Sequence, residues 1–374
     1  MTFQETYWKK PTDYLVSKRP DRPVTFFTPA ALRQMAARFQ KGFAGDVSFA
    51  VKANPTLVVV NQLVNAGLTH FDVASPEEIK LVRECGRDFT LHYNNPVRSR
   101  SEIAFAVAHG VRSFSVDRES ELEKLLDVVA PNSEIFVRLA LDLDGAAYNF
   151  GEKFGTNARA CAAMLRRISG TSHRASMTFH PGTQCNDTSI WNAYISTVAQ
   201  IARDAGVTLN TLNVGGGFPS DRGTHLTVLE DIFASIQASW LLNFDNDRPA
   251  LLCEPGRAMV ADAFSLCTRI KARSHDTVFL NDGIYGGLAE FRDVGHCERY
   301  RVYAPDGSER GGKCVEFIAF GPTCDSLDKL PSALQLPSDC AEEDYILIDG
   351  MGAYTTCIST RFNGYGDIQT IVIE

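Results

Sequence analysis

Several apolar runs in the first two thirds of the chain end on residues that can do chemistry. The run "FAVKANP" places Lys52 at the end of a buried strand, where a lysine either extends to solvent or is held as an amine nucleophile. His180 ends a second run, "ASMTFH", and the triple glycine 215–217 ends a third. A fourth run leads into "CEPGR", which supplies Glu254 and Arg257. The strand ends therefore combine an amine, an imidazole, a bare backbone and a carboxylate.

Together these residue types favour pyridoxal phosphate as the cofactor. Glycines have no side chain, so their backbone N–H groups can approach phosphate oxygens closely. The Lys52 amine would form the internal Schiff base, and Glu254 could hold a proton on the pyridine nitrogen, which makes the ring an electron sink. Each residue alone has a simpler interpretation: a tight turn for the glycines, an ion pair of Glu254 with Arg257, and a structural hydrogen bond for His180.

A closed parallel barrel is the architecture that brings such strand ends together. Between about residues 46 and 260, eight apolar runs alternate with segments of helical periodicity, such as "PEEIKLVRECG" and "WNAYISTVAQIARDAG". A (β/α)8 barrel carries its working residues at the C-terminal ends of its strands and often holds phosphate after strands seven and eight. A doubly wound open sheet is the alternative. The predicted strands are "VSFAVK", "THFDVAS", "FTLHYN", "RSFSVD", "EIFVRLAL", "ASMTFH", "TLNVGGG" and "ALLCEP".

After about residue 262 the pattern changes to short β-rich runs separated by turn residues, such as "TVFLNDG" and "DYILIDG". The predicted fold class is therefore α/β plus β, with a barrel followed by a β-sandwich or β-barrel domain. We expect an N-terminal arm at 1–27 that packs with the β domain, a cofactor-binding barrel at 28–262, and the β domain at 263–374.

The composition is that of an ordinary globular protein. The 374 residues are 44% hydrophobic and 22% charged, with a formal net charge of −8. There is no basic footprint for nucleic acid, no run long enough to span a bilayer, and no secretion signal in the first residues. The ten scattered cysteines include no CxxC pair, so neither disulfides nor a metal site is predicted. We expect a reduced, cytoplasmic protein without nucleic-acid or membrane partners.

Eight motifs follow one another along the chain, namely "FAVKANP", "FDVASPEEI", "FHPGTQC", "LNVGGGFP", "CEPGR", "NDGIYG", "GPTCDSLD" and "MGAYT". Taken in order, they resemble the motifs of eukaryotic-type ornithine decarboxylases, within the alanine racemase-like, fold type III pyridoxal-phosphate enzymes. The similarity extends from about residue 24 to residue 364, almost the whole chain. Several ordered motifs at matching spacings are far more specific than any one of them.

This resemblance implies a pyridoxal-phosphate-binding barrel, a C-terminal β domain, and a head-to-tail homodimer with two shared active sites. Lys52 would be the Schiff-base lysine, His180 the residue stacked on the ring, and Glu254 the partner of the pyridine nitrogen. Glu78 would pair with Arg138 beneath the cofactor. The implied cofactor contacts are Lys52, Asp72, Arg138, His180, Thr183, Gly217, Glu254, Arg257 and Tyr354.

The motif "GPTCDSLD" separates branches of the family. In ornithine decarboxylases its cysteine, here Cys324, would come from the other subunit and help return a proton to the α-carbon, while Asp325 would bind the distal ammonium of the substrate. Tyr285 is assigned to the same pocket. Diaminopimelate decarboxylases usually carry a glutamate-serine motif before their cysteine, so the motif favours a diamine product. A buried small hydrophobe is the alternative role for Cys324.

Two departures from the family pattern affect the site. Thr183 stands where a serine is usual and Pro181 where a small apolar residue is usual, although a hydroxyl remains available for the phosphate. The stretch "GGLAEFRDVGH" is about one residue shorter than in the family and lacks its tyrosine-aspartate-histidine run. Asp293 is the candidate for the second distal-amine ligand, with Glu290 as the alternative.

The resemblance therefore implies a carboxy-lyase that converts L-ornithine to putrescine and carbon dioxide in polyamine biosynthesis. L-lysine, or a dual lysine and ornithine activity, is the nearest alternative, because the departing stretch sets the depth of the pocket. Arginine and carboxyspermidine-type substrates are less favoured. A catalytically silent paralogue and a racemase are the remaining hypotheses. A racemase would normally need a tyrosine as its second base, and Tyr285 and Tyr354 have other assigned roles.

Overall fold

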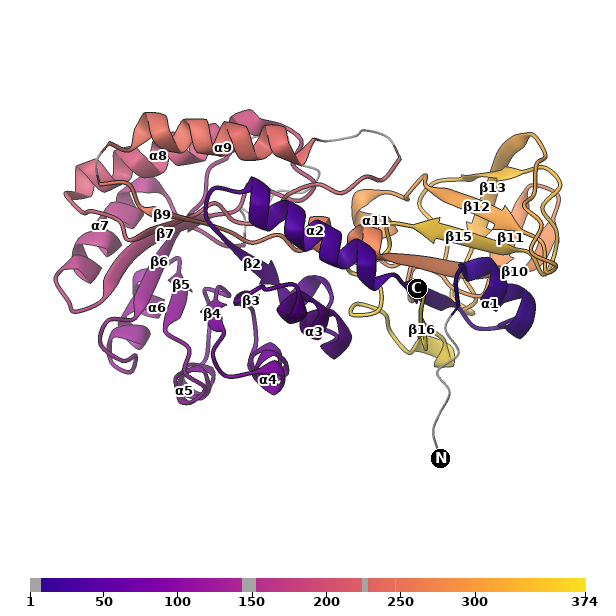
Figure 1. Ribbon diagram of the computed structural model, residues 1–374, viewed down its shortest axis with the longest axis horizontal. Helices are drawn as coiled ribbons and strands as arrows, with labels where there is room; N and C mark the ends of the chain where they lie inside the picture. The colour runs from indigo at the N-terminus through magenta and orange to yellow at the C-terminus, as the bar shows by residue number, and fades with distance from the viewer. Residues whose placement is uncertain (1–7, 143–152, 224–227, 246) are drawn as a thin grey trace. The chain divides into compact units, whose positions relative to one another are not determined.

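The chain forms two compact units, each described here by itself (Figure 1). The computed structural model describes residues 8–142, 153–223, 228–245 and 247–374. The barrel unit contains Met35–Pro219 and Thr227–Met259, and the β unit contains Met1–Gln34, Ser220–Leu226 and Val260–Glu374.

Parallel strands that close on themselves form the barrel unit. Each strand pairs with the next along the chain, and the last pairs back onto the first through Val47 and Cys253. Within the described residues the closed ring has eight strands, so the predicted barrel is confirmed and the open doubly wound sheet is excluded. The strands are β2 (Asp46–Ala50), β3 (His70–Val73), β4 (Thr90–Tyr93), β5 (Ser113–Val116), β6 (Glu134–Leu139), β7 (Arg174–Phe179), β8 (Thr211–Asn213) and β9 (Ala250–Cys253).

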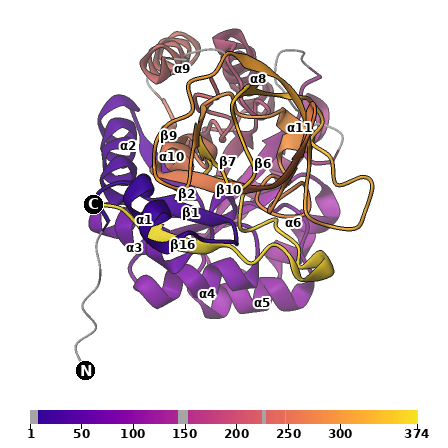
Figure 2. The ribbon, with the colours of Figure 1, turned by 90° about the vertical axis from the view of Figure 1, so that its right-hand side faces the viewer.

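Helices connect these strands, and Figure 2 shows them around the ring. Because each connection passes through a helix on the outside, the strands lie parallel and are buried between the helices and the barrel interior. A short 3-10 helix, η1 (Val51–Ala53), follows β2 directly. The helices are α2 (Pro29–Gly42), α3 (Leu57–Asn65), α4 (Pro76–Cys85), α5 (Arg100–Ala108), α6 (Glu119–Leu126), α7 (Ala158–Ser169), α8 (Thr188–Ala205), α9 (Leu229–Asn243) and α10 (Arg257–Val260).

Local sequence signals fix where these helices begin and end. Ser75 caps α4 by accepting a hydrogen bond from the Glu78 N–H, and a proline occupies the first turn of that helix. A capping box of Ser99 and Glu102 starts α5. At the C-terminal end of α8, Gly206 adopts a left-handed φ of 68°, which a glycine reaches without steric cost. The strand-to-helix turns that carry the predicted site residues are thus specified locally.

The β unit is built around a mixed sheet whose long central strand, β10 (Phe264–Ser274), pairs with β15, β11 and β1. Strand β1 (Val24–Phe27), near the chain start, pairs with β10 and also with β16 (Gln369–Val372) near its end. The described sheet contains eight strands, which agrees with the predicted β domain. Its other strands are β11 (Thr277–Leu280), β12 (Tyr300–Tyr303), β13 (Cys314–Phe320), β14 (Leu334–Pro337) and β15 (Tyr345–Asp349). Its short helices are α1 (Pro11–Lys18), η2 (Ala261–Ala263), α11 (Phe291–Val294) and η3 (Phe362–Gly364).

A buried carboxylate ties two loops of the β unit together. The Asp344 side chain is fully buried and accepts two hydrogen bonds from the Arg310 guanidinium, at 2.8 and 2.9 Å. Its Oδ2 also accepts from the Ala341 N–H at 2.7 Å. A buried charge that loses its charged partner is strongly destabilising, whereas an exposed ion pair contributes little.

We therefore expect Asp344→Asn to lower the stability of the β unit by about 2–4 kcal/mol, because the amide cannot replace both charged hydrogen bonds. Thermal unfolding followed by circular dichroism should show a fall of roughly 5–10 °C. The control is Asp367→Asn, which removes an exposed ion pair with Arg22 in the same unit and should change the melting temperature by less than about 2 °C. Equal shifts for the two variants would contradict this account.

Candidate active site

Lys52 lies in η1, directly after β2, and faces a buried carboxylate. Its Nζ is 3.5 Å from Oδ2 of Asp72, which lies on the adjacent strand β3. The Lys52 side chain is 47% exposed and that of Asp72 only 2%. The amine is thus held at the strand end by a charge partner and is still accessible to a ligand. The ends of β2 and β9 also meet closely, because the Ala50 N–H donates to the Pro255 carbonyl at 3.1 Å.

Glu254 follows β9, and its carboxylate is buried in the barrel. Asn94 and Asn213 both donate through Nδ2 to its Oε1. Burial raises the pKa of Glu254 to about 8, with a further contribution from the negative charge of Asp72. The Asn213 hydrogen bond and the charges of Lys52 and Arg138 act in the opposite direction. Glu254 Oε2 makes no hydrogen bond to any described residue, so it can accept one from a ligand.

His180 follows β7 and is held as a neutral ring. Its Nδ1 accepts a hydrogen bond from the Gly182 N–H at 3.0 Å, so the ring proton lies on Nε2. Burial lowers the pKa of His180 well below its usual value, and the charges of Arg138 and Lys52 lower it further. A neutral imidazole can lie against an aromatic ring without adding positive charge to it.

The triple glycine is packed too closely against neighbouring loops to accept any side chain. A Cβ at Gly216 would lie 2.7 Å from the Glu254 carbonyl and 3.2 Å from His180 Nε2. Gly217 has φ +80°, and a Cβ there would lie 2.8 Å from Pro181. The backbone is therefore bare where the strand ends of β7, β8 and β9 converge, which suits close approach of an anionic ligand.

The other predicted phosphate contacts lie in both units. Thr183 is partly buried and follows Gly182 in the same loop, while Arg257 is buried at the start of α10. Tyr354 belongs to the β unit, where it has a left-handed φ of 53° that is uncommon for a residue with a bulky side chain.

Glu78 and Arg138 do not form the predicted pair. Glu78 Oε2 accepts instead from the Ala74 N–H at 2.7 Å, and the described residues include no ion pair between Glu78 and Arg138. Burial raises the pKa of Glu78 to about 7, and the negative charge of Asp72 contributes to the shift. The prediction was wrong because Glu78, in the first turn of α4, turns back to the backbone N–H of Ala74 just before the helix. Arg138 extends over the ring of Phe154, 5.5 Å from its centroid.

A second group of predicted residues lies in the β unit. Tyr285 donates through its hydroxyl to Asp325 Oδ2 at 2.6 Å, and the Leu327 N–H donates to Oδ1 at 2.9 Å. The Tyr285 hydrogen bond, followed by that from Leu327, lowers the pKa of Asp325. Cys324, the preceding residue, is exposed. Asp325 is thus an oriented, negatively charged carboxylate beside an accessible thiol.

The two candidates for a second distal-amine ligand differ in their surroundings. Asp293 is exposed on α11. Glu290 caps the same helix, is largely buried, and lies 3.9 Å from Nη1 of Arg222. The carboxylate of Glu290 therefore already has a cationic neighbour, whereas that of Asp293 faces solvent.

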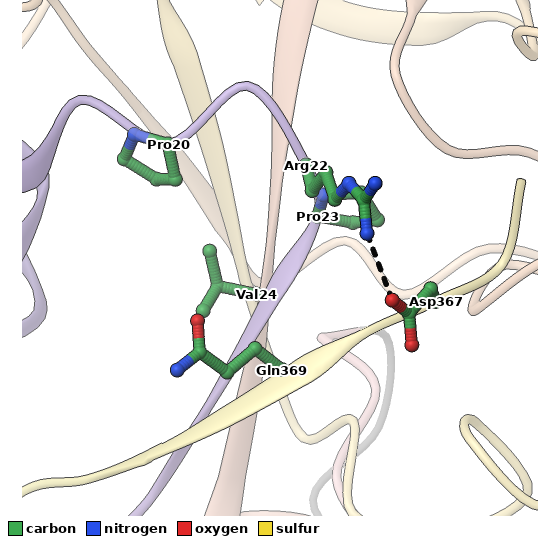
Figure 3. Close-up of a pocket in the computed structure, with 6 residues that line it drawn as sticks. All are labelled: Pro20, Arg22, Pro23, Val24, Asp367 and Gln369. Carbon is green, nitrogen blue, oxygen red and sulfur yellow. Dashed lines mark hydrogen bonds and ion pairs between the residues drawn. The ribbon is translucent and has the colours of Figure 1, made fainter.

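The pockets found in the described β unit do not contain the predicted site residues. One of about 340 Å³ is lined by Pro20, Arg22, Pro23, Val24, Asp367 and Gln369, and Figure 3 shows its ion pair between Arg22 and Asp367, 2.8 Å apart. Another of about 300 Å³ is also lined by ion pairs, Arg299 with Asp262 and Arg301 with Asp349. Both pockets are thus lined by charged side chains that already pair with one another.

Two site residues were missed by the sequence reasoning, Asn94 and Asn213. Both stand at ends of strands that were correctly predicted, in "FTLHYN" and "TLNVGGG". A polar residue at the end of a buried strand was the available signal. A neutral amide is harder to single out in a sequence than a charged or nucleophilic group.

The described part of the chain contains no group of three or more histidine, cysteine, aspartate or glutamate side chains arranged to hold a metal ion. In the same residues, no helix combines the length and the apolarity needed to cross a bilayer.

Comparison with known proteins identifies the family. The model of the pyridoxal-dependent decarboxylase, pyridoxal binding domain, matches residues 30–261. Mouse ornithine decarboxylase is 30% identical over 342 residues, which cover 85% of this chain and 73% of the mouse protein. Antizyme inhibitor 2 of Xenopus laevis is also 30% identical, over 340 residues, with the same coverage of 85% and 73%. The crystal structure of Vibrio vulnificus lysine/ornithine decarboxylase with putrescine has a TM-score of 0.80, 27% identity and 94% coverage of both chains.

The fold, the strand-end residues and these similarities define a pyridoxal-phosphate-binding barrel with a β domain. The chain belongs to the family of pyridoxal-phosphate-dependent decarboxylases that includes those of basic amino acids. The residues present fit this cofactor. A lysine amine is accessible, one oxygen of a buried carboxylate makes no hydrogen bond within the described residues, and the glycines present backbone without side chains.

The glycine run generates a test with an internal control. Gly217→Ala adds a Cβ against Pro181 and the Gly182 carbonyl in addition to the strain of a positive φ. Overpacking of about 1–3 kcal/mol should weaken pyridoxal phosphate binding by about 10- to 100-fold, measured by equilibrium dialysis. Gly206→Ala has a similar φ of +68° with nothing within 4 Å of the new Cβ, so it should lower stability modestly and leave cofactor affinity unchanged. Equal cofactor affinities for the two variants would contradict a role of the glycine run 215–217 in cofactor binding.

Proposed function

We propose that the chain catalyses decarboxylation of L-ornithine to putrescine and carbon dioxide, and so acts in polyamine biosynthesis. The observation that carries the proposal is the carboxylate of Asp325, fixed by the Tyr285 hydroxyl at 2.6 Å and by the Leu327 N–H. A carboxylate kept ionised is a partner for an ammonium group at the far end of a substrate. It would repel the distal carboxylate of meso-diaminopimelate, so it favours a substrate that yields a diamine.

The residues of the barrel unit have distinct roles in this proposal. When bound, pyridoxal phosphate supplies the electron sink that makes loss of the α-carboxylate possible. Lys52 would hold the cofactor through its amine, which Asp72 keeps close. Glu254 would keep a proton on the pyridine nitrogen. His180, whose Nδ1 accepts from the Gly182 N–H, would support the ring as a neutral imidazole.

Phosphate binding in this proposal falls to the bare backbone at Gly217, with Thr183, Arg257 and Tyr354. Arg138 supplies positive charge near Glu254 and Asp72, which lowers the energetic cost of burying both carboxylates. The second contact for the distal ammonium is assigned to Asp293, whose carboxylate is exposed, with Glu290 as the alternative.

Proton return is assigned to Cys324. After carbon dioxide leaves, the α-carbon needs a proton, and an exposed thiol next to the substrate-binding Asp325 can supply it. We propose that this thiol serves the active site of a second copy of the chain, in a homodimer with two shared sites. All ten cysteines lie in the described residues and none of them forms a disulfide, and we place the protein in the cytoplasm, where thiols stay reduced.

The proposal is tested by carbon dioxide release from L-ornithine, L-lysine, L-arginine and meso-diaminopimelate, each at low concentration with added pyridoxal phosphate. Release mainly from L-ornithine supports it. Release mainly from L-lysine would keep the chemistry and replace the substrate, since a longer chain can reach the same carboxylate. If the protein binds pyridoxal phosphate and none of the four is consumed, the decarboxylase function is wrong and a non-catalytic role replaces it. Chiral analysis of the amino acid that remains detects a racemase.

Asp325→Asn should raise the KM for L-ornithine by about 10- to 100-fold, because a hydrogen bond to a charged group contributes about 1.5–3 kcal/mol. The turnover number should fall much less, since the distal contact is made equally before and during the reaction. Asp306→Asn is the control, because Asp306 is an exposed β-unit carboxylate that bonds only Ser308. An unchanged KM in Asp325→Asn would remove the substrate role from this residue.

A further inference from the structure

Two asparagine amides from separate barrel strands converge on one oxygen of Glu254. Asn94 stands at the end of β4 and Asn213 at the end of β8, and both donate through Nδ2 to Oε1. The strands are not neighbours in the ring, so the two amides reach the carboxylate from different sides of the barrel interior. One donor would fix the distance of the carboxylate, whereas two donors also fix its rotation.

Each amide is itself fixed by a partner on its carbonyl side. The Gly215 N–H donates to Asn213 Oδ1 at 2.9 Å. Because a backbone N–H can only donate, the oxygen must face Gly215 and the NH₂ group must face Glu254. The Ser115 hydroxyl, which can donate or accept, donates to Asn94 Oδ1 at 2.5 Å and so supports the orientation in which the Asn94 NH₂ group faces Glu254. Asn213 and Ser115 are completely buried, so no bulk water competes for these bonds.

The arrangement leaves one carboxylate oxygen for a ligand. Oε1 accepts two N–H groups and therefore carries no proton, while Oε2 has no hydrogen bond within the described residues. The titratable groups that act on Glu254 are Asp72 from β3, Lys52 from η1 and Arg138 from β6, and Cys253 precedes it in the chain. His180 Nε2 and the Glu254 carbonyl both lie close to Gly216. Asp72 opposes ionisation of Glu254, whereas Lys52 and Arg138 favour it.

We propose that Asn94 and Asn213 are positioning residues that favour the ionised form of the Glu254 carboxylate and turn its Oε2 toward the pyridine nitrogen of the cofactor, and that Ser115 sets the orientation of Asn94. The inference rests on the proposed role of Glu254. It does not depend on the identity of the amino-acid substrate, because it concerns only how the protein holds pyridoxal phosphate.

The test compares Asn94→Ala with a neighbouring control, Asn95→Ala. Asn95 bonds the Ala74 carbonyl and the Val97 N–H and does not contact Glu254. The dissociation constant of pyridoxal phosphate is measured by equilibrium dialysis from about pH 6 to about pH 9, with the visible absorbance of the bound cofactor recorded at each pH.

Loss of a donor raises the pKa of Glu254 further, so more of the variant is protonated at neutral pH and fewer molecules can accept a hydrogen bond from the protonated pyridine nitrogen. Asn94→Ala should bind pyridoxal phosphate about 10-fold more weakly than the wild type near pH 7. This difference in affinity should shrink as the pH rises, because Glu254 then ionises in both proteins. Asn95→Ala should follow the wild type at every pH. A deficit that is independent of pH, or no deficit, would overturn the proposal.

Ser115→Ala keeps both donors and removes only the group that orients Asn94. It should show the same pH-dependent loss at a smaller amplitude, whereas wild-type behaviour would overturn its assigned role. Because these measurements contain no substrate, their failure is separable from that of the proposed function. A wild-type protein that binds the cofactor and decarboxylates no amino acid contradicts only the proposed function.

Discussion

The barrel interior holds two carboxylates, Asp72 and Glu254, and their burial is the constraint on which the rest of the site depends. A buried charge is costly unless charged partners and hydrogen bonds compensate it. Lys52 is 3.5 Å from Asp72, and Arg138 adds positive charge toward both acids. Glu254 is hydrogen-bonded by two neutral amides, which stabilise its carboxylate without cancelling its charge as a further cation would. The amine, the neutral imidazole of His180 and the free carboxylate oxygen follow from this balance.

The two units carry different groups of candidate site residues. The barrel unit gathers the groups that fit pyridoxal phosphate at the ends of its strands, where glycine backbone replaces side chains. The β unit carries an oriented carboxylate and a thiol in one short loop, with Tyr285 bonded to Asp325. Family membership follows from the barrel. The choice of amino acid is proposed from the β unit, which is why the cofactor is established more firmly than the substrate.

Much of the fold and part of the site could be predicted from sequence, for physical reasons. The strands were recognisable because parallel barrel strands are apolar on both faces and end at capped helices such as α4. Lys52, His180 and Glu254 stood out because charged or nucleophilic groups are rare at such strand ends. The roles of Asn94 and Asn213 could not be predicted, since they arise only where β4 and β8 meet Glu254 in space. The pairing of Glu78 with Arg138 failed because a local backbone hydrogen bond to Ala74 took precedence.

The most direct test of the account is the identity of the residue that binds the cofactor covalently. Pyridoxal phosphate bound to the protein is reduced with borohydride, which makes the link to an amine permanent, and the modified peptide is then located by mass spectrometry. The account predicts modification at Lys52, and its loss in Lys52→Arg with the fold retained. Modification at any other lysine, or none in a protein that binds the cofactor, would contradict the assignment of the strand ends as the cofactor site.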